Sequence, residues 1–308
     1  MRILIIGLGV QGTKRLKVAG SDVVATVDEY KSEADFKNLK EVPLDLFDSA
    51  ILCTPDEAKF ELIQYLLENS KHALVEKPLW AASEKLINKM EELANSNKVL
   101  LQTAYNHRFE PNILRAKNVI ENGELGEIYS CSLFYGNGTA QIVRESNWRD
   151  MGLGVVKDLG SHLLDIVSFW FSASRPAKFD LRAFDFENKS PDHAIMTSLD
   201  SSILVNLEMS LCMWQNDFRC DIIGSEGSLH INGLCKWGPS KLSVRKRVRP
   251  SGIPNKRDEE QPAGDPTWQL EYQNFKQNIE KSIKTNLDVD RWILKILRDE
   301  SLDHHDFK

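Results

Sequence analysis

Two acidic residues and one histidine, spaced along a single predicted helix, have types and positions that suit proton-transfer chemistry. Asp158 and His162 are four residues apart in the apolar-periodic segment 156–171, so both project from one helix face, and Asp165 lies near that face. Histidine titrates near neutral pH and suits proton exchange with a hydroxyl group, and an acid one turn away can orient its ring or hold a ligand. The spacing fits an ion pair on a solvated helix surface equally well.

A lysine that directly follows a predicted buried strand forms a second group. Polar residues that end neighbouring strands of an open α/β sheet surround one crevice, because ligands bind beyond the carboxyl ends of the strands. Three segments have this position: Thr54-Pro55, Glu76-Lys77-Pro78 and Asn106-His107-Arg108. Lys77 in such a crevice can polarise a carbonyl group or donate a proton. A surface lysine before a turn proline is the alternative that the spacing leaves open.

A glycine-rich turn follows the first apolar strand. It has the form G-x-G-x-x-G, with Gly7, Gly9 and Gly12 around Val10 and Gln11, and it opens a predicted helix. In a dinucleotide-binding turn the first glycine allows the tight bend, the second lets the backbone approach a pyrophosphate, and the third lets the helix pack closely on the strand. The helix N-terminus then offers N–H groups to the phosphates. An ordinary strand–helix turn is the alternative.

Asp28 ends the second predicted strand, at about the position where an acid accepts hydrogen bonds from the hydroxyls of an adenosine ribose. A carboxylate there repels a 2′-phosphate, so the sequence favours NAD over NADP. Lys31 lies close along the chain and weakens that preference. A surface aspartate without such a role is the alternative.

The predicted elements change in character near residue 122. Apolar runs at 1–6, 22–27, 49–53, 72–75 and 99–103 alternate with helical patterns, which predicts a parallel sheet covered on both faces. Seven strand-like segments of mixed polarity between 128 and 249, with one helix at 156–171, predict a mainly antiparallel sheet. We expect two domains, 1–122 and 123–308, with a mobile charged loop at 250–265 and two final helices. The last helix, 289–298, can pack back on the first domain.

The composition argues against several classes of protein. The 308-residue chain has a formal net charge of -6, whereas a general nucleic-acid binder carries an excess of Lys and Arg. It lacks a run of 18 apolar residues that could span a membrane, and its first apolar stretch is too short for a signal-peptide core. Five scattered cysteines without a C-x-x-C pair argue against a disulfide framework and a zinc site. We expect a cytoplasmic protein with no metal, nucleic-acid or membrane partner.

Several short motifs occur together, in one order, along essentially the whole chain. They are the glycine turn, Thr54-Pro55, Glu76-Lys77-Pro78, Tyr105-Asn-His-Arg-Phe-Glu-Pro111, Trp148-Arg149, Asp158-Leu-Gly-Ser-His162-Leu-Leu-Asp165 and Gly224-Ser-Glu-Gly227. In this combination the chain resembles the Gfo/Idh/MocA family, named for glucose–fructose oxidoreductase, inositol dehydrogenase and rhizopine catabolism. The resemblance implies an N-terminal Rossmann domain with a doubly wound parallel sheet, followed by an α+β domain with a large, mainly antiparallel open sheet. In this family the open sheet commonly packs against its counterpart in another subunit, which implies a homodimer or homotetramer.

The resemblance also implies an NAD-dependent oxidoreductase. Hydride would pass between nicotinamide and a hydroxyl or carbonyl carbon of a sugar, cyclitol or nucleotide sugar. The catalytic group would be Lys77, Asp158 and His162, with His162 as proton acceptor or donor, and these three residues with Arg108 would bind the substrate. Cofactor contacts are expected from Gly7, Gly9, Val10, Gln11, Gly12, Asp28, Thr54, Pro55, Glu76, Lys77, Pro78, Asn106, Trp148 and Arg149.

The chain departs from the family pattern in three places. The family often has a histidine two or three positions after T-P, where this chain has Asp56-Glu57-Ala58. The glycines before the catalytic motif are reduced to Gly152 and Gly154, and Lys157 directly precedes Asp158. These departures concern the substrate more than the chemistry.

Two alternative functions stay open. A non-catalytic dinucleotide-binding regulator on the same scaffold would need neither Lys77 nor His162, and a biliverdin-reductase-like reductase would use a different substrate class. The residues Arg245, Arg247 and Arg249 share one face of a predicted strand. They could form a phosphate-binding rim, but we favour a solvated sheet edge or a subunit contact.

Overall fold

The computed structural model of the chain describes residues 1–146 and 149–298. These residues form two compact units. Of the described residues, the first unit contains 1–106 and 267–294, and the second contains 107–146, 149–266 and 295–298. The division differs from the predicted boundary at residue 122, because helix α4 (Pro111–Glu121) packs against elements of the second unit. Helix α7 (Thr267–Glu280) joins the first unit, where Tyr272 and Phe275 pack in the same core as Ile3 and Ile5.

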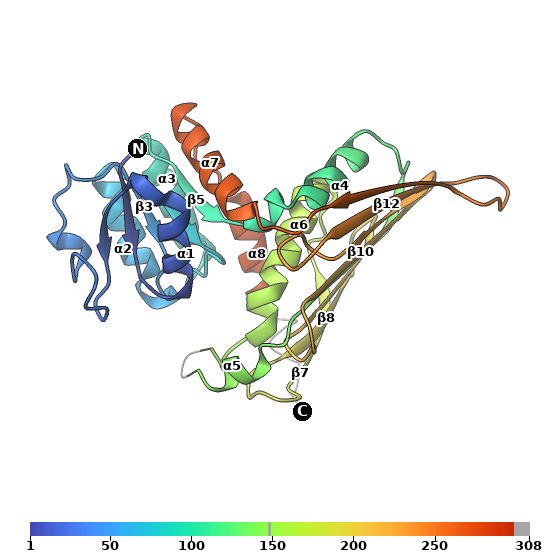
Figure 1. Cartoon of the computed structure of the whole chain (residues 1–308), viewed down its shortest axis with the longest axis horizontal. Coiled ribbons are helices and arrows are strands. Elements are labelled where there is room, and N and C mark those ends of the chain that lie inside the picture. The colour runs from blue at the N-terminus through green and yellow to red at the C-terminus, as the bar shows by residue number, and fades with distance from the viewer. Residues whose placement is uncertain (147–148, 299–308) are drawn as a thin grey trace. The chain divides into compact units, whose positions relative to one another are not determined.

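A five-stranded parallel sheet forms the centre of the first unit, in the order β2-β1-β3-β4-β5 (Figure 1). Its strands are β1 (Ile3–Ile6), β2 (Val23–Val27), β3 (Ser49–Leu52), β4 (His72–Glu76) and β5 (Leu101–Ala104). Nearly all of their side chains are buried, as expected for strands with helices on both faces. The strand order reverses at β1, so the loops after β1 and β3 flank the topological switch point where ligands bind in such sheets.

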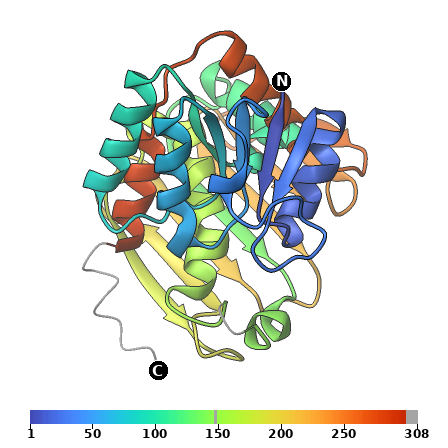
Figure 2. The same cartoon turned by 90° about the vertical axis from the view of Figure 1, so that its left-hand side faces the viewer.

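Helices cover both faces of this sheet. Ile3 and Ile5 point to the face that is covered by α1 (Val10–Ala19) and α7, whereas Leu4 and Ile6 point to the other face. The second face is covered by α2 (Asp56–Glu68), α3 (Glu84–Ser96) and the first part of α8 (Asp288–Arg298), whose Leu294 belongs to the same core (Figure 2). The prediction of a doubly wound α/β domain is confirmed.

An eight-stranded sheet forms the second unit, in the order β13-β12-β11-β10-β6-β9-β8-β7. Its strands are β6 (Ile128–Gly136), β7 (Phe179–Phe184), β8 (His193–Ser198), β9 (Leu204–Ser210), β10 (Asp217–Gly224), β11 (Gly227–Asn232), β12 (Ser240–Lys246) and β13 (Asn255–Gln261). Only β6 and β9 pair in parallel among these described strands. The predicted large, mainly antiparallel sheet is therefore confirmed.

One face of this sheet carries the helices of the unit (Figure 1). Helix α4 packs against α6 (Ser161–Phe171) and β12, and the helical turn that precedes α6 packs on β9. Buried and exposed side chains alternate along β10, which is the pattern of a strand with one buried face. A short helix, α5 (Ala140–Arg144), and 3-10 turns at Gly20–Asp22, Leu39–Glu41, Asn106–Phe109 and Ser172–Ser174 complete the described elements.

The segment 250–265 was predicted to be a mobile loop, and this prediction is wrong for its central part. Strand β13 pairs with β12 over seven residues, from Ser240↔Gln261 to Lys246↔Asn255. The sequence NKRDEEQ has no apolar residue, so it gives no periodic hydrophobic signal. It forms a strand at the sheet edge, where backbone pairing and cross-strand ion pairs such as Lys241–Asp258 replace burial.

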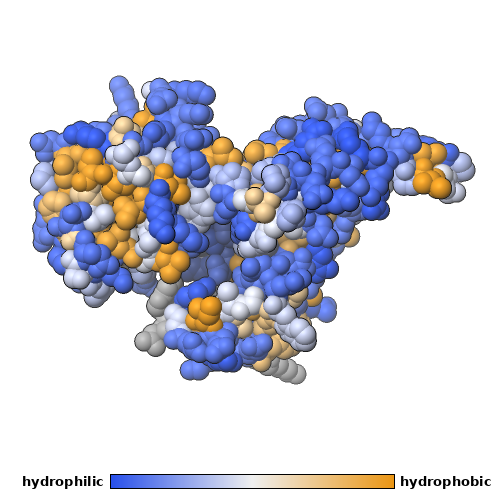
Figure 3. Space-filling view, in the orientation of Figure 1, coloured by the Kyte–Doolittle hydropathy of each residue, from blue (hydrophilic) through white to orange (hydrophobic). Residues whose placement is uncertain are grey.

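The turn between β12 and β13 is the part of the hairpin with exposed apolar surface. Figure 3 shows hydrophobic surface near the hairpin tip, and Ile253 in this turn is 92% exposed. Within the described residues, no helix has the length and apolar character needed to cross a membrane.

Candidate active site

The glycine turn of the first unit has the geometry that the sequence predicts. Gly7 has a φ of +88°, and a Cβ there would lie 2.7 Å from the Cys53 carbonyl oxygen. A Cβ on Gly12 would lie 1.8 Å from the Gly7 carbonyl oxygen, so the first turn of α1 packs directly against the loop. By contrast, no heavy atom of the described residues lies within 4 Å of a Cβ built on Gly9. The first and third glycines are thus required for packing, and the second faces open space beside the helix N-terminus.

The Asp28 carboxylate holds this loop. Its Oδ2 accepts a hydrogen bond from the Leu8 backbone N–H at 2.6 Å, and its Oδ1 accepts from the N–H groups of Tyr30 and Lys31 at 2.9 and 3.0 Å. Partial burial raises the pKa of Asp28, but the three backbone hydrogen bonds and the nearby Lys31 charge outweigh it and lower the pKa overall. The acid is therefore ionised at neutral pH and lies next to the glycine turn.

Thr54 contributes an unsatisfied hydroxyl beside the same turn. Its methyl group would lie 3.4 Å from a Cβ on Gly7, and its buried Oγ1 has no hydrogen-bond partner among the residues that the structure describes. Pro55 follows as the N-cap residue of α2. A buried hydroxyl without a hydrogen-bond partner is costly, so the Thr54 hydroxyl is an unsatisfied polar group next to the glycine turn.

The Glu76 carboxylate is held by a buried arginine. Arg15 of α1 donates through Nε to the Glu76 carboxylate at 2.7 Å, and its Nη1 donates to Glu271 of α7. Arg15 is 1% exposed, and although burial lowers its pKa, the two carboxylates outweigh this effect and raise it. Glu76, which was predicted to contact the cofactor, thus connects the end of β4 to α1 and α7.

The turn that contains Lys77 is held by a second buried cation, which the sequence analysis did not identify. The ammonium group of Lys59 on α2 donates to the Glu76 carbonyl oxygen at 3.0 Å and to the Pro78 carbonyl oxygen at 3.1 Å. It also pairs with the Asp56 carboxylate at 2.7 Å. Lys59 therefore binds the carbonyl oxygens of the residues before and after Lys77, and the Lys77–Pro78 peptide bond is cis.

Asn106 has its side chain engaged within the first unit. Its Nδ2 donates to the Thr267 hydroxyl at the start of α7, at 2.8 Å. Its predicted contact with a cofactor stays a prediction.

In the second unit, the predicted catalytic helix begins with a π-helical turn at Val156–Gly160, which continues into α6. Asp158 and His162 would share one face in a regular α-helix. The wider turn moves Asp158 relative to His162. Asp158 is partly exposed and pairs with Arg149 at 3.4 Å, whereas His162 is 9% exposed.

His162 packs against a second histidine. Its ring stacks on His107, with ring centroids 4.0 Å apart and an interplanar angle of 26°. Tyr135 of β6 lies against both rings, at 5.4 Å from His107 and 6.1 Å from His162. Lys236, from the loop between β11 and β12, donates to His107 Nε2 and to the Tyr135 hydroxyl, each at 3.0 Å. We call these four residues the histidine cluster.

Lys236 and Tyr135 were missed by the sequence analysis. Tyr135 ends a strand and Lys236 lies alone in a loop, so neither belongs to a spacing pattern that indicates a site.

Arg108, predicted to bind the substrate, makes a bidentate ion pair with Asp165 of α6. Its Nε lies 2.9 Å from both carboxylate oxygens, and its Nη2 donates to one of them. Asp165 is fully buried, so this pair orients the Arg108 side chain. The role of Asp165 is thus to hold Arg108.

The remaining predicted residues have varied positions. Trp148 lies outside the described residues. Arg247 donates to the Ser225 carbonyl oxygen at 3.1 Å, and Arg249 pairs with Glu226, so both bind the Gly224–Gly227 turn. Both residues lie beyond the end of β12 at Lys246, and these contacts support a structural role for them.

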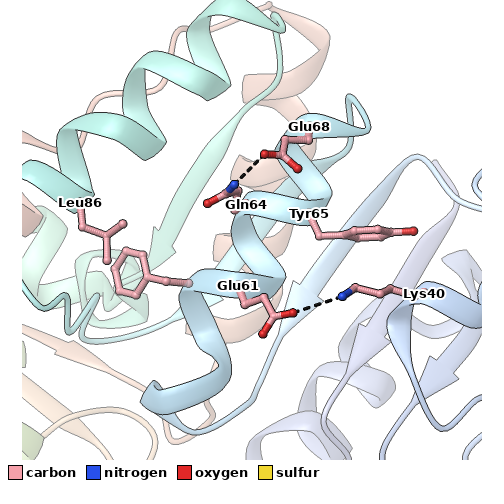
Figure 4. A pocket seen from close by; sticks show the side chains of 7 residues that line it. Lys40, Glu61, Gln64, Tyr65, Glu68 and Leu86 are labelled. Atoms are coloured by element: carbon pink, nitrogen blue, oxygen red, sulfur yellow. Dashed lines mark hydrogen bonds and ion pairs between the residues drawn. The ribbon is translucent and has the colours of Figure 1, made fainter.

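A shallow pocket lies elsewhere on the first unit, on the outer surface of α2 and α3. It is lined by Lys40, Phe60, Glu61, Gln64, Tyr65, Glu68 and Leu86, and ion pairs and hydrogen bonds such as Lys40–Glu61 cross it (Figure 4). None of these lining residues belongs to the glycine turn or to the Glu76–Pro78 turn.

Comparisons with known proteins agree with this geometry. Residues 1–105 match the family model described as "Oxidoreductase family, NAD-binding Rossmann fold". Residues 113–230 match the model of the Gfo/Idh/MocA C-terminal domain. The first match covers all five strands of the parallel sheet, and the second covers the eight-stranded sheet from β6 into β11 but not β12 or β13.

Two curated relatives from Bacillus subtilis (strain 168) illustrate the similarity. The scyllo-inositol 2-dehydrogenase (NAD(+)) is 26% identical over 272 residues, which cover 80% of this chain and 78% of the relative. The glucose-6-phosphate 3-dehydrogenase is 28% identical over 205 residues, which cover 61% of this chain and 58% of the relative. In several curated relatives the matched segment spans only 40–63% of the relative's length.

Solved structures share the fold over nearly the whole chain. Levoglucosan dehydrogenase in complex with NADH and levoglucosan has a TM-score of 0.82 at 17% identity, covering 98% of this chain and 96% of that one. Together with the matches to both of the family's domain models, the motifs and the two sheets show that the chain belongs to the Gfo/Idh/MocA family of oxidoreductases.

Proposed function

We propose that this protein is an NAD-dependent dehydrogenase that acts on a CH–OH group, or on the corresponding carbonyl, of a sugar, cyclitol or nucleotide sugar. The glycine turn carries the cofactor part of the proposal, because Gly9 faces open space, Thr54 has an unsatisfied buried hydroxyl next to Gly7, and the ionised Asp28 binds the Leu8 backbone of the same turn. These features fit a dinucleotide better than an ordinary strand–helix turn, which needs none of them.

The residues of the first unit have separate roles in this proposal. Backbone N–H groups at Val10 and Gln11 would face the phosphates at the start of α1. Asp28 would accept a hydrogen bond from a ribose hydroxyl, because a carboxylate offers about four acceptor positions and the backbone uses three of them. Bound NAD would supply the carbon that accepts or donates the hydride.

The proposed chemistry uses Lys77, Asp158 and His162. Lys77 would donate a hydrogen bond to the reacting oxygen of the substrate, and His162 would accept the hydroxyl proton during oxidation or return it during reduction. Asp158 would orient the substrate, and Arg108, held by Asp165, would bind another substrate oxygen.

The substrate class rests on the relatives. The two Bacillus subtilis proteins are named for inositol and glucose 6-phosphate, which are both polyhydroxylated rings. We propose a ring polyol or its derivative for this protein on that ground.

Two variants test the catalytic assignment. Lys77→Ala and His162→Ala should still bind NAD, as measured by calorimetry, but should lose at least about 100-fold in turnover because each removes a proton donor or acceptor. Lys85→Ala, which removes an exposed lysine of α3, is the matched control and should keep full activity.

The substrate for this assay comes from a thermal-shift panel of sugars, cyclitols and nucleotide sugars in the presence of NAD, since a ligand of the folded state raises its melting temperature. Turnover in both variants at the level of the unmodified protein would refute the assignment. NAD binding without turnover on any panel member that shifts the melting temperature would favour a non-catalytic regulator.

A further inference from the structure

Lys236 has an unusual position for a lysine, because its ammonium group lies among aromatic rings. The side chain is half-buried, and its Nζ lies 4.4 Å from the Trp237 ring centroid and 5.2 Å from the Tyr135 ring centroid. It donates to His107 Nε2 and Tyr135 Oη at 3.0 Å. Four separate segments of the second unit thus bring together the histidine cluster: the turn at Asn106–Phe109, β6, α6 and the loop before β12.

The hydrogen bond from Lys236 determines the form of His107. An ammonium group has three donors and no acceptor, so His107 Nε2 must accept and cannot carry a proton. While Lys236 is charged, His107 is therefore a neutral ring with its proton on Nδ1. His107 is 2% exposed, so water has little access to replace Lys236 as the hydrogen-bond partner of Nε2.

The ring stack transmits this effect to His162. The two imidazole rings lie 4.0 Å apart and nearly parallel, so a positive charge on His162 is close to His107 and to the ammonium bonded to it. Like charges at such separations repel, and the repulsion is stronger in a buried site than in water. A charged Lys236 thus disfavours a protonated His162.

We propose that Lys236 is a positioning residue for proton transfer: through the His107–His162 stack, its ammonium keeps His162 neutral and able to accept a proton at lower pH than it otherwise could. The link to catalysis rests on the proposed function, whereas the electrostatic effect is a property of the histidine cluster itself. No proton passes through Lys236, which acts by its charge and its hydrogen bonds.

The effect has a defined pH range. Burial lowers the pKa of Lys236 to about 8, against the opposing charges around it. Those groups are Asp265, Cys235, Glu110 and Asp158, and the cluster adds His107, His162 and Tyr135. Lys236 is mainly charged below about pH 8 and loses its charge above it. The influence on His162 should therefore be present at neutral pH and weaken in mildly alkaline solution.

Histidine NMR titration of the cofactor-free protein tests the proposal without any substrate. In Lys236→Met, the titration midpoint of His162 or His107 should rise by about one pH unit, because a nearby positive charge is removed. Lys236→Arg should keep the unmodified midpoint because it restores the charge. Lys241→Met removes an equal charge from the exposed edge of β12 and should shift neither ring.

The activity readout follows once a substrate is known. In Lys236→Met, the acid limb of the kcat/KM profile for alcohol oxidation should move to higher pH by the same amount, with the dissociation constant of NAD unchanged. If Lys236→Met does not fold, as judged by circular dichroism, Lys236→Gln provides the same loss of charge with a polar side chain.

The outcomes separate the two proposals. Unchanged histidine midpoints in a folded Lys236 variant, or an equal shift in Lys241→Met, would overturn the role of Lys236 even if the protein is an active dehydrogenase. Shifted midpoints with Lys77→Ala and His162→Ala fully active would support the electrostatic effect and refute the proposed function.

Discussion

Lys59 shows how one buried side chain can fix a turn that carries a functional residue. It is 2% exposed and binds the carbonyl oxygens on both sides of Lys77 as well as the Asp56 carboxylate. Lys77 itself needs a defined direction if it is to donate to a substrate oxygen. We infer that Lys59 fixes the direction of the Lys77 side chain by holding the backbone of the turn in place.

Replacement of Lys59 by methionine should therefore be destabilising. The change keeps the apolar volume but leaves two carbonyl groups and one carboxylate without their donor, at about 1–3 kcal/mol for each buried group. We expect a loss of about 3 kcal/mol in the free energy of unfolding, measured by urea denaturation. Lys85→Met on exposed α3 is the control, and an equal loss in both variants would contradict the role of Lys59.

Asp28 gives a second prediction at the residue scale. Its pKa is lowered in the folded state, so its contribution to stability is present above the pKa of the unfolded chain, about 3.9, and is lost as the pH falls through the lower folded value. Asp28→Ala should abolish this pH-dependent contribution to the free energy of unfolding and leave the loop less stable at pH 7. It should also reduce the ratio of NAD to NADP affinity, because the charge that would repel a 2′-phosphate is gone.

Calorimetric titration with both cofactors, and acid unfolding curves of the two proteins, measure these effects. Asp28→Asn is the informative companion, because it keeps an acceptor for the loop N–H groups but removes the charge. An unchanged cofactor ratio in both variants would show that Asp28 does not select the cofactor.

Single residues were predictable where local rules specify them. Gly7 and Gly12 could be identified because their steric requirements follow from the turn itself, and Asp28 because it ends a strand beside that turn. Lys236 and Lys59 could not be identified, since their importance arises from contacts with segments far away in the sequence. A single lysine in a sequence does not indicate which distant segments it will contact.

At the scale of elements, Arg15 connects three parts of the first unit. It lies on α1 and pairs with Glu76 at the end of β4 and with Glu271 on α7. The guanidinium carbon Cζ of Arg15 lies 4.3 Å from the centroid of the Trp268 ring. These contacts fix the distance between the helix that follows the glycine turn and the strand that leads into Lys77.

Loss of this arginine should be costly for the whole unit. Arg15→Met leaves two carboxylates buried without a counter-charge, and breaking a buried pair in this way costs about 3–5 kcal/mol. Urea denaturation should show this loss. A double variant, Arg15→Met with Glu271→Gln, should recover part of it because one orphaned charge is removed; a further loss instead would contradict the electrostatic explanation.

The elements themselves were predictable to different degrees. The five parallel strands were identified because buried strands have continuous apolar runs, as in Ile3–Ile6. Strand β13 was not, because an edge strand of charged residues has no apolar period. The π-helical turn at Val156–Gly160 was also missed, since a one-residue widening of a helix leaves no sign in the hydrophobic pattern.

At the scale of the whole molecule, we propose that a second copy of the chain packs on the face of the eight-stranded sheet opposite its helices. Leu204, Ile223 and Ile195 point to this face and are 48%, 39% and 37% exposed. Leu204 and Ile223 share one row of the sheet, because both are in register with Ser130 between them. Exposed apolar side chains grouped on one sheet face are a feature of contacts between proteins.

Sedimentation equilibrium should therefore give a mass of at least twice 35.1 kDa. Leu204→Glu should shift the protein toward the monomer, because it would place a charge in an apolar contact. Glu208→Gln, on the same face of β9, is the control. A monomeric mass for the unmodified protein at micromolar concentration would refute the proposal.

The return of α7 to the first unit has a consequence for how the protein is made. Tyr272 and Phe275 complete the core around Ile3 and Ile5, yet they are encoded more than 160 residues after β5. Until residues 107–266 have been synthesised, the face of the first sheet that carries Ile3 and Ile5 is therefore covered by α1 but not by α7. Chaperones that shield apolar surface would find their target in this interval.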